Sequence, residues 1–168
     1  MLPIVLDPAS IAVGLCGVGE GLARRQQMLA AAGVLPAAVA PETPDEALCG
    51  LAALFIAGLP HAEAHRLAAR ARLAGVLVNV EDLPALCDFH VPSAIRRGDL
   101  LLTVSTSGKA PGLAKAIREW LERLFEAAWG ERLSEAAEAR LRWRRDGHPP
   151  AEVARRGVAL AREKGWLS

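Results

Sequence analysis

The chain has 168 residues, a formal net charge of +1 and 52% apolar residues. This length suits one compact domain, or one domain with a small appendage, and the near-zero charge argues against a dedicated nucleic-acid binder. The three cysteines, Cys16, Cys49 and Cys87, form no CxxC pair, which favours a reduced, cytoplasmic setting. No secretory signal or membrane span is expected, because Asp7 interrupts the first apolar run and the apolar stretch 47–59 is too short to cross a bilayer.

Short apolar runs alternate with helical patterns through the first half of the chain. The predicted strands are residues 3–6, 11–15, 37–40, 52–57 and 76–80. The predicted helices are residues 22–32, 44–50 and 60–73, and Gly33 and Gly75 end two of them. Strands that alternate with helices are typical of parallel βαβ units, so the sequence predicts an α/β fold with a parallel sheet.

The second half of the chain is mainly helical. One further strand is predicted at residues 100–105, and helices are predicted at residues 111–129, 132–144 and 150–164. Apolar residues recur at helical spacing along the first of these helices. We expect a sub-domain boundary near residues 82–100.

A predicted strand leads into a helix through a glycine-rich turn, Gly17-Val18-Gly19-Glu20-Gly21. In dinucleotide-binding folds the first glycine allows the tight bend, and the second lets backbone N–H groups approach a pyrophosphate. Gly17 and Gly19 fit these two roles. The third position, where a small residue lets the helix pack closely on the sheet, is Leu22, and Gly21 beside it is the candidate to compensate. Glu42, after the next predicted strand, is the candidate partner of the ribose hydroxyls. A plain turn without a ligand is the alternative.

A second polar segment, Asn79-Val80-Glu81-Asp82, follows the strand predicted at residues 76–80. Ligands bind at the carboxyl ends of parallel strands in open α/β sheets, so the Asp82 carboxylate is placed to face a cofactor. The alternative is that Asp82 caps the turn that follows it.

A third polar segment, Ser105-Thr106-Ser107-Gly108-Lys109, lies between a predicted strand and a predicted helix. It differs from a nucleoside triphosphatase loop, because Thr103 stands where a glycine is needed and Ala110 where a hydroxyl is needed. A hydroxyl-rich loop at a helix start is a fair site for carboxylates, and a simple connector is the alternative. His61 and His65 do not match a zinc-protease pattern, so no protein-bound metal is predicted.

Three stretches of the chain resemble the precorrin-2 dehydrogenase/sirohydrochlorin ferrochelatase family, the N-terminal domain of siroheme synthases. They are Leu2–Leu6 with the glycine turn and Arg24-Arg25, then Asn79–Ile95, then Val104–Ala114. The resemblance implies a shortened Rossmann-like NAD-binding domain over residues 1–82, a dimerisation and active-site region over residues 83–112, and a helical region over residues 113–168. It also implies a cytoplasmic homodimer of siroheme (porphyrin) biosynthesis.

The resemblance implies a role for particular residues. The family's catalytic aspartate falls on Asp82. The implied NAD contacts are Gly17, Val18, Gly19, Glu20, Gly21, Pro41 and Glu42. The implied tetrapyrrole contacts are Asn79, Ser105, Thr106, Ser107, Gly108 and Lys109. Arg96 and Arg97 are further candidates to meet the substrate's carboxylates.

The activity implied is NAD-dependent oxidation of precorrin-2 to sirohydrochlorin, with insertion of Fe²⁺ as a substrate to give siroheme. One carboxylate close to the macrocycle could accept protons in both steps. The alternatives are an NAD-independent sirohydrochlorin chelatase and a non-catalytic tetrapyrrole-binding partner. The chain departs from the family at Leu22, at a shortened segment before Ala52, and at Ala57-Gly58-Leu59-Pro60, where the family has a polar turn.

Overall fold

The computed structural model describes residues 2–167, which form two compact units, the first ending at Val91 and the second beginning at Pro92. None of the helices within residues 2–167 combines the length and the apolar character that a membrane span needs. The three-part functional division of the chain stays a prediction.

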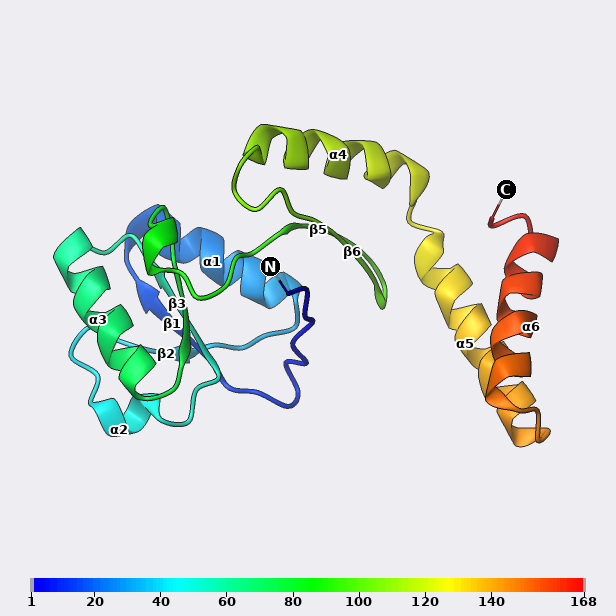
Figure 1. Cartoon of the computed structure of the whole chain (residues 1–168), viewed down its shortest axis with the longest axis horizontal. Helices are drawn as coiled ribbons and strands as arrows, with labels where there is room; N and C mark the ends of the chain where they lie inside the picture. Colours follow the sequence, from blue (N-terminus) through cyan, green and yellow to red (C-terminus); the bar gives the residue numbers. More distant parts are fainter. Residues whose placement is uncertain (1, 168) are drawn as a thin grey trace. The chain divides into compact units, whose positions relative to one another are not determined.

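The first unit is a four-stranded parallel sheet with helices packed on its two faces (Figure 1). Its strands are β1 (Val13–Gly17), β2 (Ala37–Ala38), β3 (Ala53–Ala57) and β4 (Leu77–Val80), in the order β2-β1-β3-β4. Its helices are α1 (Gly19–Ala31), α2 (Asp45–Leu48) and α3 (His61–Leu73), and a 3-10 helix, Pro84–Leu86, follows β4. The predicted α/β fold with a Rossmann-like parallel sheet is confirmed.

The sheet is shortened at the edge formed by β2. This strand is two residues long, both of them exposed, and the four-residue α2 is the only helix between β2 and β3. A full doubly wound sheet would carry a third strand outside β2. The shortening predicted from the segment before Ala52 is therefore a missing edge strand.

The core of the first unit lies on both faces of the central strands. All five residues of β3 are buried. Leu54 and Ile56 point into the layer under α3, while Phe55 points into the layer under α1. Burial on both faces explains why β3 reads as a continuous apolar run and not as an alternating one.

The second unit combines an antiparallel hairpin with three helices. The hairpin pairs β5 (Ser93–Arg97) with β6 (Leu100–Val104), and the helices are α4 (Pro111–Leu124), α5 (Trp129–Arg145) and α6 (Pro150–Glu163). α5 and α6 lie side by side as a helical pair (Figure 1). The hairpin turn approaches the start of α5 closely, because a Cβ on Gly98 would lie 3.3 Å from the Gly130 Cα.

Two predictions about individual elements are wrong, and one strand was not predicted. Residues 3–6 form no strand, because no neighbouring strand pairs with them and Leu2 and Val5 are exposed. The strand that was not predicted is β5, whose only fully buried residue is Ile95. The helix predicted over residues 111–129 ends at Leu124, and a separate helix starts at Trp129.

Candidate nucleotide site and catalytic corner

The glycine turn brings β1 and β3 into direct backbone contact. The Val18 N–H donates a 3.1 Å hydrogen bond to the Ala57 carbonyl, and a Cβ on Gly17 would overlap that same carbonyl oxygen. On the other side Gly58 has a left-handed φ of 71°, and a Cβ there would overlap the Val18 carbonyl oxygen. Glycine is therefore required at both positions for the two loops to approach each other.

Helix α1 starts with an open N-terminus. Gly19 has a φ of 62°, and nothing lies within 4 Å of where its Cβ would be. No side chain caps the helix at Val18. Because the first N–H groups of a helix have no partner within the helix and carry its positive end, this turn can receive an anion such as a pyrophosphate.

The close packing of α1 on the sheet occurs at Gly21. This residue is buried, and a Cβ there would overlap Glu81 Oε2 and lie 3.2 Å from the Gly58 nitrogen. Leu22 instead packs, partly buried, against the apolar layer that contains Phe55. Gly21 thus does what the third small residue of a dinucleotide turn does.

Glu42 lies at the carboxyl end of β2, in a loop held by Arg70. The Arg70 guanidinium donates to the Pro41 carbonyl at 2.7 Å, to the Thr43 carbonyl, and to Asp45 Oδ1 at 2.7 Å. A cavity of about 320 Å³ lies here, lined by Pro41, Glu42, Glu63, Arg66, Leu67 and Arg70. Glu42 is exposed and can accept hydrogen bonds from hydroxyl groups.

Cys16 lies close to this region but takes no part in acid–base chemistry. Burial, together with the nearby carboxylates of Glu42 and Glu63, raises the pKa of the Cys16 thiol to about 11. The thiol is therefore neutral at physiological pH and packs as an apolar residue in the layer under α3.

Two successive carboxylates after β4 have different surroundings. Glu81 is only 14% exposed, and its oxygens lie 3.4 Å from Arg24 Nη2 and 3.8 Å from Arg25 Nε, both on α1. Asp82 is exposed and has a left-handed φ of 60°. Within residues 2–167 its side chain makes no hydrogen bond or ion pair, and no side chain caps the 3-10 helix that follows. The alternative that Asp82 serves as a turn cap is thus not supported.

Asn79 supports this region from inside. It is 5% exposed, and its Nδ2 donates to the Phe89 carbonyl at 2.9 Å. The Phe89 ring meets Phe55 edge-on at 5.3 Å between centroids. Contact between Asn79 and a substrate stays a prediction.

The hydroxyl-rich loop belongs to the second unit. Ser105 Oγ accepts from the Ser107 N–H at 3.3 Å, and Thr106 Oγ1 accepts from the Ala110 N–H at 3.3 Å. Ser107 and Gly108 both have a left-handed φ, and Ser107, Gly108 and Lys109 are exposed. α4 then starts at Pro111 without a side-chain cap. The loop is therefore organised by its own hydroxyl groups and leaves the Lys109 side chain at the surface.

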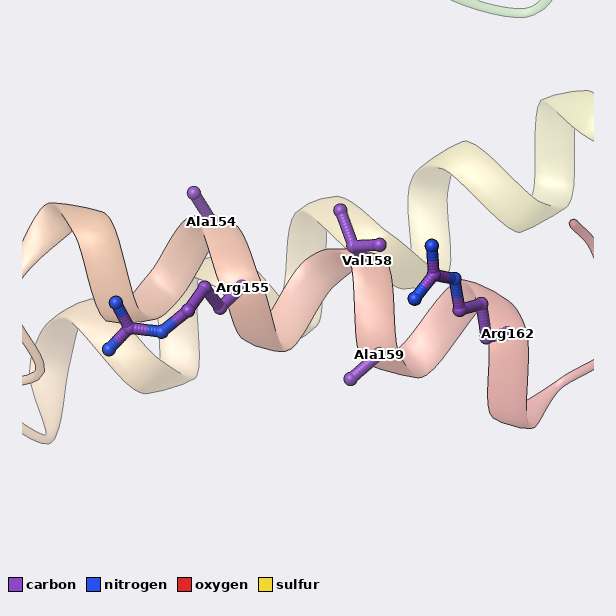
Figure 2. Close-up of a pocket in the computed structure, with 5 residues that line it drawn as sticks. All are labelled: Ala154, Arg155, Val158, Ala159 and Arg162. Atoms are coloured by element: carbon purple, nitrogen blue, oxygen red, sulfur yellow. The ribbon is translucent and has the colours of Figure 1, made fainter.

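The two predicted arginines of β5 differ. Arg97 Nε donates to the Phe125 carbonyl at 2.7 Å, so its guanidinium helps to hold the second unit together. Arg96 is exposed. A separate hollow of about 450 Å³ lies on the outer surface of α6, lined by Ala154, Arg155, Val158, Ala159 and Arg162 (Figure 2). It contains no carboxylate, histidine or cysteine.

The carboxyl edge of the parallel sheet thus collects the glycine turn, the loop with Pro41 and Glu42, Gly58 and the Glu81–Asp82 pair. Sequence reasoning missed Glu81, Arg70 and Cys87, which shape this edge. The spacing of Glu81 and Arg70 does not predict their contacts with residues distant in sequence, and the contact of Cys87 with Val80 depends on β4 being an edge strand. Gly58 was missed as well, although a glycine directly after an apolar strand is a recognisable signal for a turn.

These features define the class as a Rossmann-like dinucleotide-binding fold. A family profile described as "Putative NAD(P)-binding" matches residues 4–93, and the chain belongs to that family. It is 35% identical over 156 residues to a siroheme synthase of Thiobacillus denitrificans, covering 81% of this chain and 32% of the relative. It is 33% identical over 159 residues to a siroheme synthase of Methylobacillus flagellatus, covering 83% and 34%. The chain thus spans about a third of the length of these relatives.

A solved structure titled "SirC, precorrin-2 dehydrogenase" has the same fold. It aligns with a TM-score of 0.70 at 20% identity and covers 95% of this chain and 89% of that one. The resemblance to the precorrin-2 dehydrogenase family is confirmed by these comparisons together.

The residues present fit a dinucleotide. The uncapped start of α1 and the empty space beside Gly19 suit a pyrophosphate, and the Glu42 carboxylate suits ribose hydroxyls. The close approach of Gly17 to the Ala57 carbonyl excludes a side chain at Gly17 itself.

Proposed function

We propose that the protein oxidises precorrin-2 to sirohydrochlorin with NAD⁺. The observation that carries the proposal is the free carboxylate of Asp82, which follows a strand of the sheet whose carboxyl edge also bears the glycine turn. The family, the names of the relatives and the fold of the solved dehydrogenase support it.

The reaction removes a hydride and a proton from the substrate. NAD⁺, when bound, supplies the acceptor for the hydride. The chain's own part is to take the proton, and we assign that step to Asp82. Its exposed carboxylate has no partner among the described residues and is free to reach a macrocycle N–H or C–H. Glu81 is unsuited to this role, since it faces Arg24 and Arg25.

Binding of the tetrapyrrole needs positive groups and N–H donors, because the substrate is a polycarboxylate. Lys109 and Arg96 are exposed, and the uncapped start of α4 adds backbone N–H groups. We assign Ser105, Thr106, Ser107, Gly108 and Lys109 to the substrate on this basis, together with the family resemblance.

A homodimer is part of the proposal. Leu113, Trp120 and Leu124 share one face of α4 and are 56%, 52% and 53% exposed. An apolar stripe of this kind is typical of a surface that a partner covers. A cytoplasmic location is also proposed, in keeping with three free cysteines.

Insertion of Fe²⁺ into sirohydrochlorin is a second proposed activity. It requires loss of pyrrole protons, and Asp82 is again the available acceptor. Fe²⁺ is here a substrate, and no group of metal-ligating side chains occurs among residues 2–167.

The test uses purified protein with precorrin-2 and NAD⁺. Wild-type protein should produce the absorption spectrum of sirohydrochlorin, and Asp82→Asn should abolish it while NAD⁺ binding by calorimetry stays unchanged. Glu46→Gln, at an exposed carboxylate on α2, is the matched control and should leave the rate unchanged. Metal insertion without NAD⁺ binding would favour the chelatase alternative. Tight sirohydrochlorin binding without any turnover would favour the non-catalytic partner.

A further inference from the structure

The outer edge of β4 has no neighbouring strand. β4 is the last strand in the order β2-β1-β3-β4, so one side of its backbone faces away from the sheet. Edge strands of this kind leave N–H and carbonyl groups that need other partners. In this protein the partners come from two consecutive residues after the 3-10 helix, Cys87 and Asp88.

Asp88 pairs with Val78. The Asp88 N–H donates to the Val78 carbonyl at 2.8 Å, and Asp88 Oδ2 accepts from the Val78 N–H at 2.9 Å. Arg72 Nε holds the same carboxylate at 2.9 Å. Both outward groups of Val78 are thus satisfied without a strand.

Cys87 does the same for Val80, and it does so with its side chain. Cys87 Sγ accepts from the Val80 N–H at 3.2 Å and lies 3.2 Å from the Val80 carbonyl oxygen, to which the thiol can donate. The same sulfur lies 3.5 Å from the Leu83 carbonyl oxygen. One thiol therefore contacts backbone groups on both sides of Asp82.

We propose that Cys87 is the positioning residue that fixes the Asp82 corner, defined as residues 80–83, so that the Asp82 carboxyl is presented to the reaction. The proposal rests on the proposed dehydrogenase function. The inner side of the corner is held by the Glu81 N–H, which donates to the Ile56 carbonyl at 2.9 Å. The outer side is held by the Cys87 thiol, and Asp82 lies between them.

The backbone at Asp82 shows why the corner needs this support. Its φ of 60° is a left-handed conformation, which aspartate adopts more readily than most residues but which is still less favourable than an extended backbone. Without the thiol, the turn from Val80 to Leu83 is closed by the long Leu83 N–H to Val80 carbonyl bond of 3.4 Å, and the Leu83 carbonyl still accepts from the Leu86 N–H at 2.9 Å. Asp82 would then relax toward an extended backbone, and its carboxyl would move relative to the sheet edge.

Two variants separate the thiol's hydrogen bonds from its volume. Cys87→Ala leaves the Val80 N–H without its partner, while Cys87→Ser keeps a donor and an acceptor at that place. Cys49→Ala is the matched control, because Cys49 is exposed and the one hydrogen bond that its thiol makes within residues 2–167 is to the Asp45 carbonyl on α2.

The first measurement is amide hydrogen exchange of the full chain at residues 78–83. In Cys87→Ala, exchange at Val80 should rise about tenfold, because one hydrogen bond of ordinary strength is lost. Exchange at Glu81, bonded to β3, is the internal reference. Cys87→Ser should restore most of the protection, and Cys49→Ala should not change it.

The second measurement is steady-state oxidation of precorrin-2. Displacement of a reacting group by a fraction of an ångström to an ångström lowers turnover strongly, so kcat should fall about tenfold or more in Cys87→Ala and recover in Cys87→Ser. The KM for NAD⁺ should stay unchanged, because the glycine turn is built from β1 and β3. A partial loss of folded protein would also lower the apparent kcat at an unchanged KM, so kcat is calculated per folded molecule, with the folded fraction taken from far-UV circular dichroism.

The outcomes are distinct. Unchanged exchange at Val80 in Cys87→Ala, or raised exchange with wild-type kcat, overturns the proposal. A wild-type protein that does not oxidise precorrin-2 overturns the proposed function instead. In that case the exchange data still test the role of Cys87. Protection of the Val80 N–H that is lost in Cys87→Ala and restored in Cys87→Ser supports this role, and any other pattern refutes it.

Discussion

Replacing Gly21 by alanine should destabilise the first unit, although alanine is the better helix former. Gly21 lies inside α1, where an exposed glycine-to-alanine change would stabilise the helix by about 1 kcal/mol. Here the added Cβ would overlap Glu81 Oε2 and would lie 3.2 Å from the Gly58 nitrogen. The Gly58 nitrogen belongs to the backbone and cannot turn aside.

The magnitude follows from these opposing effects. Overpacking of a tight contact costs about 1–3 kcal/mol. The Glu81 carboxylate, 14% exposed, would also have to leave Arg24 and Arg25, and such ion pairs contribute up to about 1 kcal/mol. Set against the helix gain of about 1 kcal/mol, these costs leave a net loss of up to about 3 kcal/mol, and the middle of that range, about 1–2 kcal/mol, is the expected decrease in the free energy of unfolding of the first unit.

The assay is urea unfolding followed by two signals. All four tryptophans are in the second unit, so their fluorescence follows that unit, while far-UV circular dichroism follows both. In a Glu81→Ala background the penalty of Gly21→Ala should shrink by about 1 kcal/mol, because the closest contact is gone. Gly157→Ala on α6, where nothing lies within 4 Å of the new Cβ, should instead be stabilising. A Gly21→Ala protein that is more stable than wild type, or a strictly additive double variant, would refute the reasoning.

Three further predictions concern charge and pH. Arg70→Met removes three hydrogen bonds from the loop that carries Glu42; it should lower the stability of the first unit by about 1–3 kcal/mol and weaken NAD⁺ binding, measured by dichroism and calorimetry. The pKa of Cys16 is raised from 9.0 to about 11, so the unfolded chain loses this proton first. The free energy of unfolding should therefore fall as pH rises from 9 to 11, and Cys16→Ala should flatten that slope in urea titrations. The pKa of Glu152 is lowered below 4.5, chiefly by its hydrogen bond from Arg156. Its stabilising contribution is present above pH 4.5 and is lost as pH falls through the lowered value, so Glu152→Gln should show a weaker acid dependence by tryptophan fluorescence.

The parallel sheet could be predicted because its signals are local. An apolar run such as Ala53–Ala57, followed by a helical pattern and a glycine, determines its own secondary structure. The glycine turn could be predicted for the same reason, since the residues that allow its backbone conformations are consecutive in the sequence. Even there, the sequence placed the third small position at Leu22, because spacing alone does not tell which residue faces the sheet.

The β5–β6 hairpin and the support of the Asp82 corner could not be predicted. β5 buries only Ile95 fully and carries two arginines, so it has almost no apolar pattern. The contacts of Glu81 with α1 join residues more than fifty positions apart. Cys87 is close to Val80 in sequence, but its role depends on β4 being an edge strand, which is a property of the whole sheet.

The missing strand bears on the nucleotide site less than its size suggests. Dinucleotides bind where the strand order reverses, and here the chain proceeds outward from β1 to β2 on one side and from β3 to β4 on the other. The reversal point therefore lies between β1 and β3, where the Val18 N–H meets the Ala57 carbonyl and both loops need glycine. The lost strand would lie outside β2, two strands away from that point. The fold is thus shortened at the edge that carries the loop with Pro41 and Glu42, and Arg70 fastens that loop to α3 in place of the absent neighbour.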